Sequence, residues 1–239
     1  MYLAKLLKLG VALLLGSLVA CSPLISLNNS FDVNGDDVTK LANVETDKAN
    51  KANPQYKSIV YDNIIKTTHK KHLAKQGGAS LDKATNNKLR RVMQQLLAKN
   101  QLLDKKFTPI VIASDSVNAF SLSSQSRIAY LYVTVGLMKF VDNDDQLASV
   151  VAHEISHIQL GHHLLRTTNS AAQFNQTQEL AADKYSMKLI ANAGYRPSQA
   201  IILLERLDIF QAKYNVTNQA DYPSNKARIK ALKPIIAAL

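Results

Sequence analysis

The stretch His153-Glu154-Ile155-Ser156-His157 places two imidazoles four residues apart, with a carboxylate directly after the first. On an α-helix, residues i and i+4 share one face, about 5–6 Å apart at Cβ. That separation suits two ligands of one zinc ion, because zinc binds histidine nitrogen at about 2.0–2.1 Å. Glu154 lies about 100° further round the helix, where it can serve as general base for an attacking water. The motif therefore predicts a zinc-hydrolase site on a helix.

Apolar residues lie on several sides of this predicted helix: Leu147, Val150, Val151, Ile155 and Ile158. A histidine pair on a largely buried helix needs partners, since an unpaired polar group is costly to bury. The pattern therefore favours a metal site over a helix that happens to carry surface histidines.

A catalytic zinc site takes three protein ligands and keeps one open position, so a third ligand must lie outside the motif. His163 has the spacing of the long metzincin motif, six residues after His157. That motif also needs a glycine three residues after the second histidine, and this chain has Leu160 there. Glu179 is the better candidate, because 22 residues leave room for a loop and a returning helix after His157.

Asp183 lies one helical turn after Glu179 and on the same face. There it can accept a hydrogen bond from the distal N–H of a ligand histidine and fix its tautomer. The alternative for both acidic residues is a solvated helix face. The chain has only four glutamates, and this scarcity favours the ligand role for Glu179.

Hydrophobic periodicity predicts an α+β domain that is mostly helical, with a small β-sheet beside the motif helix. Residues 128–134 alternate, which puts Tyr130 and Tyr132 on one face of a strand and Leu131 and Val133 on the other. The motif helix is predicted to run to about residue 166, with N-cap candidates at residues 142–145. The other predicted elements are a strand at 108–113 and helices at 56–76, 81–104, 136–141, 177–192, after Pro197 to about 213, and from 224 with an interruption at Pro234.

The first twenty residues have the features of a bacterial secretory signal, with Lys5 and Lys8 ahead of a short apolar run. That run is too short to span a membrane. It ends at Leu18-Val19-Ala20-Cys21, which resembles a bacterial lipobox. We therefore expect a lipoprotein signal peptide and a lipidated Cys21, in preference to a plain secretory signal before an unrelated cysteine.

Lipidation of Cys21 would hold the protein at a membrane through more than one acyl chain, which is enough for stable anchoring. Ser22, rather than aspartate, follows the cysteine and resembles the outer-membrane address of enterobacterial lipoproteins. The expected location is therefore the bacterial outer membrane, facing the periplasm. Cys21 is the only cysteine, so its lipidation would leave neither a disulfide nor a cysteine nucleophile.

Residues 21–55 are rich in small polar and charged side chains, which predicts a flexible tether, and residues 56–239 then form one domain. The chain has 29 basic and 18 acidic residues, a net charge of +11. Such a charge is consistent with attraction to anionic lipid and equally with plain solubility. No basic motif with interleaved aromatic residues indicates a nucleic-acid partner.

Two segments carry a family resemblance: Val151-Ala152-His153-Glu154-Ile155-Ser156-His157 and Glu179-Leu180-Ala181-Ala182-Asp183. Together they make the chain similar to the HtpX-like and CAAX-prenyl-protease-like zinc metallopeptidases, metallopeptidase family forty-eight. Residues 117–120 and 132–137 also resemble that family, and the whole resemblance covers about residues 110–229. It implies a zincin-like (gluzincin) fold and, since no apolar span follows the signal, the soluble lipid-anchored bacterial branch. That branch is implicated in quality control of envelope and outer-membrane proteins.

One segment departs from the family, whose members usually carry a His-Pro pair followed by Arg-Ile. Here Tyr222 stands in the histidine position, before Pro223. Its hydroxyl can steady a tetrahedral oxyanion, but tyrosine is a poor candidate for a switchable metal ligand. Arg228 matches the family and is expected at the oxyanion or behind a ligand, with an ordinary surface ion pair as the alternative.

The resulting hypothesis is an endopeptidase with one Zn²⁺ held by His153, His157 and Glu179. Glu154 would take the proton of a water and pass it to the leaving amine. The strand at 128–134, through Tyr130, Leu131 and Tyr132, would pair with an extended substrate, which suits unfolded or misassembled polypeptides.

Two other functions remain open. The first is a latent, chaperone-like zinc lipoprotein whose site is closed by polar loops at 167–176 and 214–223. A protein side chain at the fourth zinc position would favour it. The second is a structural helix without metal, which a zinc measurement would exclude. Nothing in the sequence indicates an oligomeric state.

Overall fold

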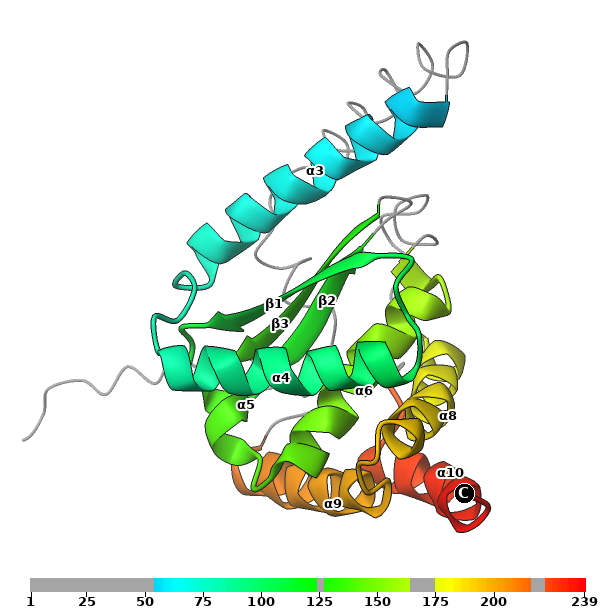
Figure 1. Ribbon diagram of the computed structural model, residues 1–239. Coiled ribbons are helices and arrows are strands. Elements are labelled where there is room, and N and C mark those ends of the chain that lie inside the picture. Colours follow the sequence, from blue (N-terminus) through cyan, green and yellow to red (C-terminus); the bar gives the residue numbers. More distant parts are fainter. Residues whose placement is uncertain (1–53, 124–126, 164–174, 216–221) are drawn as a thin grey trace, which may run out of the picture.

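The computed structural model describes residues 54–123, 127–163, 175–215 and 222–239. The predicted signal peptide, Cys21 and nearly all of the predicted tether lie outside these ranges. The described elements, labelled in Figure 1, are α3 (Pro54–Lys75), α4 (Lys83–Lys99), β1 (Lys106–Ile112), β2 (Ala119–Ser123), β3 (Ile128–Thr134), α5 (Val135–Phe140), α6 (Asp144–Gln159), α8 (Gln176–Asn192), α9 (Ser198–Lys213) and α10 (Asn225–Ala237). The α+β prediction, mostly helical with a small sheet, is confirmed.

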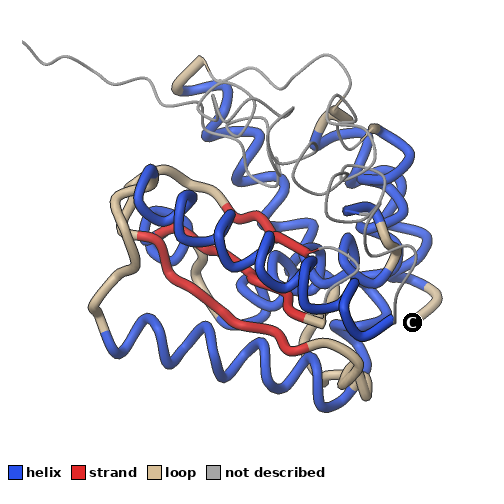
Figure 2. The backbone as a smooth tube through the Cα atoms, turned by 90° about the horizontal axis from the view of Figure 1, so that it is seen from above, coloured by secondary structure: helices blue, strands red, loops and turns tan. Residues whose placement is uncertain are grey.

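The sheet has three strands in the order β1-β3-β2, which Figure 2 shows side by side in red. β1 pairs parallel with β3, and β2 pairs antiparallel with it. β3 is therefore the central strand, and its backbone groups are already used on both sides. The prediction that Tyr130, Leu131 and Tyr132 pair with a substrate is wrong, because β-augmentation requires a free edge. β2, a five-residue strand, was not predicted.

The two faces of β3 bury different side chains, as the alternation predicted. Tyr132 packs with Phe120 on one face, where α3 covers the sheet, whereas Leu131 and Val133 face the main core. His72 of α3 contacts both rings, with centroids 4.5 Å from Phe120 and 5.1 Å from Tyr132. In Figure 1, α3 lies above the sheet and the other described helices lie along its front and below it.

α6 is the central helix of the domain, and its side chains from Gln146 to Ile158 are all buried. It packs against α4, α8, α9 and the sheet. Asn143, one of the predicted caps, accepts a hydrogen bond from the backbone N–H of Gln146 at the start of the helix. The helix ends at Gln159, earlier than predicted, because Gly161 takes a positive φ of 69° that turns the chain.

α10 runs to Ala237 straight through Pro234, so the predicted interruption is wrong. The proline costs one intrahelical hydrogen bond. Leu232, which is 1% exposed, and the partly buried Ile235 and Ile236 pack against the core and hold the helix in place. In the described part of the chain, no helix has both the length and the apolarity needed to cross a membrane.

Candidate metal centre

The site is built from one face of α6 and the first turn of α8. α6 presents His153 and His157, and α8 brings Glu179 against them. The Nε2 atoms of the two histidines are 3.0 Å apart, and Glu179 oxygens lie 3.2 Å and 3.5 Å from them. A tetrahedral ion with bonds of about 2.0–2.1 Å separates its ligand atoms by about 3.3 Å. The three donor groups are therefore spaced for one zinc ion.

Burial makes a cation the natural partner of these groups. His153 is 2% exposed, and both His157 and Glu179 are fully buried. Neither carboxylate oxygen of Glu179 has a hydrogen-bond donor of good geometry among the described residues. A buried carboxylate without a donor is costly unless a positive charge compensates it. The residues present therefore fit a divalent metal, and their two nitrogens and one oxygen suit zinc.

The two imidazoles have different electrostatic surroundings. Burial lowers the pKa of His153, but Asp183 and Glu179 outweigh burial and raise that pKa to about 9. Burial dominates at His157 and lowers its pKa to about 4, although Glu179 acts in the opposite direction. Burial also opposes ionisation of Glu179, yet the imidazoles keep the pKa of its carboxyl below the usual value. The pocket therefore stabilises a positive charge between these three groups.

Asp183 lies on α8 one turn after Glu179, behind His153. Its Oδ1 is 2.9 Å from Nδ1 of His153, which leaves Nε2 of that ring facing Glu179. Arg228 of α10 donates two hydrogen bonds to the same carboxylate, from Nε to Oδ2 at 2.7 Å and from Nη2 to Oδ1 at 2.6 Å. Asp183 therefore lies within hydrogen-bonding distance of Nδ1 of His153, where a residue that supports a ligand histidine is expected.

Arg228 is 4% exposed, so it is not the ordinary surface ion pair that the sequence left open. Its Nη1 also donates to the hydroxyl of Tyr222 at 2.9 Å. The guanidinium is thus engaged with Asp183 and Tyr222 behind His153. In this arrangement both residues support the ligand side of the site.

Glu154 is fully buried beside His153, and its carboxylate is held by a residue of β2. Ser121 Oγ lies 2.8 Å from Oε2 of Glu154 and 3.0 Å from Nε2 of His163. His163 therefore contacts Ser121 and is absent from the metal-ligand cluster of the described residues, which contains only His153, His157 and Glu179. The metzincin alternative for the third ligand is not supported.

Sequence reasoning missed two residues of this centre, Ser121 and His162. His162 Nδ1 lies 2.8 Å from Nδ1 of His157. A signal for His162 was present, since four of the six histidines fall between residues 153 and 163. Ser121 had none, because its place depends on how β2 pairs with β3.

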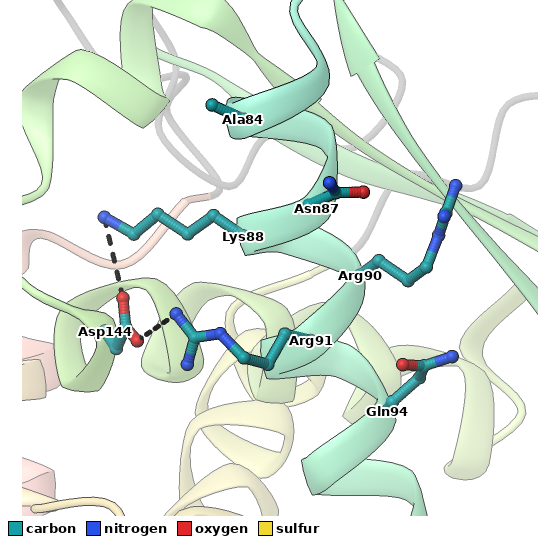
Figure 3. A pocket seen from close by; sticks show the side chains of 7 residues that line it. All are labelled: Ala84, Asn87, Lys88, Arg90, Arg91, Gln94 and Asp144. Carbon is teal, nitrogen blue, oxygen red and sulfur yellow. Dashed lines mark ion pairs between the residues drawn. The ribbon is translucent and has the colours of Figure 1, made fainter.

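A separate hollow lies over α4, and no metal-site residue lines it. Figure 3 shows Lys88 and Arg91 reaching Asp144 at the start of α6, with N–O distances of 3.6 Å and 2.6 Å. These half-exposed ion pairs tie α4 to the beginning of α6. They offer no donor set for a metal and no convergent catalytic groups.

A buried His-His-Glu cluster with a second glutamate beside it, on a mostly helical fold with a small sheet, is typical of metalloproteases. Comparison with known proteins agrees. Residues 83–177 match the model of Peptidase family M48, a segment that contains both histidines and Glu154 and ends just before Glu179. Over these residues the chain is thus similar to Peptidase family M48, as its motifs indicated, and these findings support a metalloprotease.

One similar curated protein is the "Mitochondrial metalloendopeptidase OMA1" of Schizosaccharomyces pombe. It is 24% identical over 174 residues, which cover 60% of this chain and 50% of that protein. The chain therefore spans about half the length of this relative.

Proposed function

We propose that this chain is a zinc-dependent endopeptidase. The observation that carries the proposal is the buried donor set of His153, His157 and Glu179, whose ligand atoms all lie within 4.8 Å of one another. Glu154 follows the first ligand directly, in the position of a general base. The family match of residues 83–177 supports the same chemistry, and a peptidase family implies polypeptide substrates.

Zinc held by His153, His157 and Glu179 would polarise the scissile carbonyl and lower the pKa of the attacking water. Glu154 accepts the proton of that water and passes it to the leaving amine. Asp183, which is hydrogen-bonded to Arg228, favours the tautomer of His153 that carries its proton on Nδ1, because its Oδ1 lies 2.9 Å from that nitrogen.

The outer edge of β2 is a suitable partner for the substrate's backbone next to Glu154. Among the described residues, no strand pairs with that edge. Thr134 N–H donates to the carbonyl of Asn118, which sets the antiparallel alternation between β2 and β3. The backbone groups of Ala119 and Ser121 consequently face away from β3. An extended peptide paired there would lie beside Glu154, because Ser121 contacts that carboxylate.

The location and the natural substrates form the finer part of the proposal. The lipobox before Cys21 and the following Ser22 support a lipid anchor at the bacterial outer membrane, facing the periplasm. A site at that surface, with an edge strand that binds backbone, suits unfolded or misassembled envelope proteins. The proposed role is their quality control by proteolysis.

The deciding experiment replaces Glu154 with glutamine and compares the purified variant with the wild type. The variant should retain one zinc per chain and lose cleavage of unfolded casein. Cleavage at the wild-type rate would show that Glu154 is not the base. Zinc-loaded wild type that binds casein without cleaving it would instead favour the latent, chaperone-like lipoprotein.

Two further measurements test location and substrates. Cys21→Ala should move the protein from the membrane fraction to the soluble fraction, and a variant that stays membrane-bound contradicts the anchor. Comparing the envelope proteome of cells with wild-type enzyme and with Glu154→Gln should reveal proteins that accumulate only with the variant.

A further inference from the structure

Two consecutive histidines follow α6 and belong to neither the ligand set nor the proposed base. His162 and His163 are 7% and 4% exposed. They lie just past Gly161, whose φ of 69° is in the left-handed region that glycine tolerates best. That turn ends α6 and brings both imidazoles back against the metal centre.

His162 contacts the ligand His157 on the side away from the cluster. The two Nδ1 atoms are 2.8 Å apart, and the ring planes meet at 66°. Nε2 of His157 faces Glu179 and His153, so a metal there requires the lone pair of that nitrogen. His157 must then carry its proton on Nδ1 and donate it to Nδ1 of His162. His162 thus supports the ligand His157 from behind, in the same way that Asp183 supports the ligand His153.

His163 reaches the site by a different route, through Ser121. The Ser121 hydroxyl has one proton and lies 2.8 Å from Oε2 of Glu154. An ionised carboxylate only accepts hydrogen bonds, so Ser121 donates to Glu154. The hydroxyl also lies 3.4 Å from the backbone carbonyl oxygen of Glu154, which is a longer contact. With its proton given to Oε2 of Glu154, the 3.0 Å contact to Nε2 of His163 must be donated by the imidazole. The chain from His163 through Ser121 holds one carboxylate oxygen of Glu154 in place.

We propose that His162 and His163 are positioning residues with separate tasks. His162 orients the ligand His157, and His163 orients the base Glu154 through Ser121. The task of His162 concerns metal binding alone, whereas the task of His163 rests on the proposed peptidase function. Each residue therefore predicts a different defect when it is replaced.

The first experiment measures zinc affinity of the full-length protein by competition with a chelator, and it needs no catalytic activity. His162→Ala should weaken zinc binding about 10–100-fold, the usual effect of losing a partner of a ligand histidine. His162→Asn should bind zinc nearly as the wild type does, because its amide oxygen stands where Nδ1 stood and accepts the same proton. His163→Ala should leave zinc affinity within about threefold of wild type.

The second experiment measures steady-state cleavage of a fluorogenic peptide by zinc-saturated protein. His163→Ala should lower kcat about tenfold with KM unchanged, as expected when a hydrogen bond that positions a catalytic group is lost. His163→Gln should recover most of the rate, since its amide nitrogen stands where Nε2 stood. Combining Ser121→Ala with His163→Ala should cost no more than Ser121→Ala alone, because both act through one chain of contacts.

A readout without turnover separates this proposal from the proposed function. Calorimetric affinity for a peptide hydroxamate, whose proton a neighbouring carboxylate accepts, should fall in His163→Ala and recover in His163→Gln even if no peptide is cleaved. Wild-type zinc affinity in His162→Ala, with circular dichroism showing native structure, would overturn the first task. Unchanged kcat and unchanged hydroxamate affinity in His163→Ala would overturn the second.

Discussion

Replacing Arg228 with leucine should lower the free energy of unfolding by about 3–5 kcal/mol. The guanidinium is 4% exposed and donates to both oxygens of Asp183, at 2.7 Å and 2.6 Å. Without it, the Asp183 carboxylate stays buried with the His153 imidazole as its remaining partner in the described part of the chain. Removing one member of a buried ion pair has a large effect because the other charge is left uncompensated.

The loss of unfolding free energy in Arg228→Leu should depend on pH. Burial opposes ionisation of Asp183, yet Arg228 and then His153 hold the pKa of its carboxyl well below the usual range. A carboxyl pKa that is lowered by folding adds stability above its ordinary value of 3.8, and this stability is lost as pH falls through the folded value. In Arg228→Leu this contribution shrinks. The difference between variant and wild type should therefore be largest near neutral pH and narrow in acid.

Urea unfolding of the metal-free protein, followed by circular dichroism at neutral pH and near pH 3, measures both effects. Arg228→Lys is the matched control, because it keeps the positive charge but loses the bidentate hydrogen bonding. The free energy of unfolding should fall by about 1–2 kcal/mol in this variant. Adding Asp183→Asn to Arg228→Leu should recover part of the loss, because no buried charge then lacks a partner. Arg228→Leu within about 1 kcal/mol of wild type at neutral pH would refute the reasoning.

Three further predictions concern other parts of the molecule. Burial, together with His69 and Lys75, lowers the pKa of His72 from 6.5 to about 4. The free energy that holds α3 against the sheet should therefore fall by about 3 kcal/mol as pH drops from 6.5 to 4. Faster hydrogen exchange in α3 would measure this loss. His72→Phe should remove most of this pH dependence. Free zinc at about 100 times its Kd should stabilise the fold by about 2.7 kcal/mol, and calorimetry in a chelator should show the corresponding lower Tm. Gly136→Ala should destabilise by more than about 2 kcal/mol in urea unfolding, because its Cβ would lie 2.2 Å from the Asp115 carbonyl oxygen.

The limits of sequence reasoning are clearest in the sheet. The alternation of residues 128–134 predicted a strand and its two faces, because side-chain direction within a strand is local. It could not show that β3 is central, since strand order depends on pairing with β1 and β2 across the chain. The substrate strand was therefore assigned to β3, one strand inside the edge. β2, which has no further strand on its outer side among the described residues, was not predicted.

The ends of helices show the same limit at shorter range. The cap at Asn143 follows from residues within one turn, and it was among the predicted caps. The end at Gln159 depended on the conformation of Gly161, and the continuation through Pro234 depended on packing of α10 against the core. In α10, tertiary contacts decided between conformations that the local sequence allows, whereas α6 ends at a local glycine turn.

The sequence by itself determined the chemistry of this protein: two histidines one turn apart, a glutamate beside the first, and Glu179 with Asp183 on a second helix. Helical spacing is a local property, so it paired His153 with His157 and Glu179 with Asp183. The resemblance to a peptidase family, rather than spacing, assigned the two pairs to one site. Only the tertiary structure decided what surrounds them. It placed Arg228 and Tyr222 behind Asp183, and Ser121 against Glu154, because these contacts join elements that are far apart in the chain.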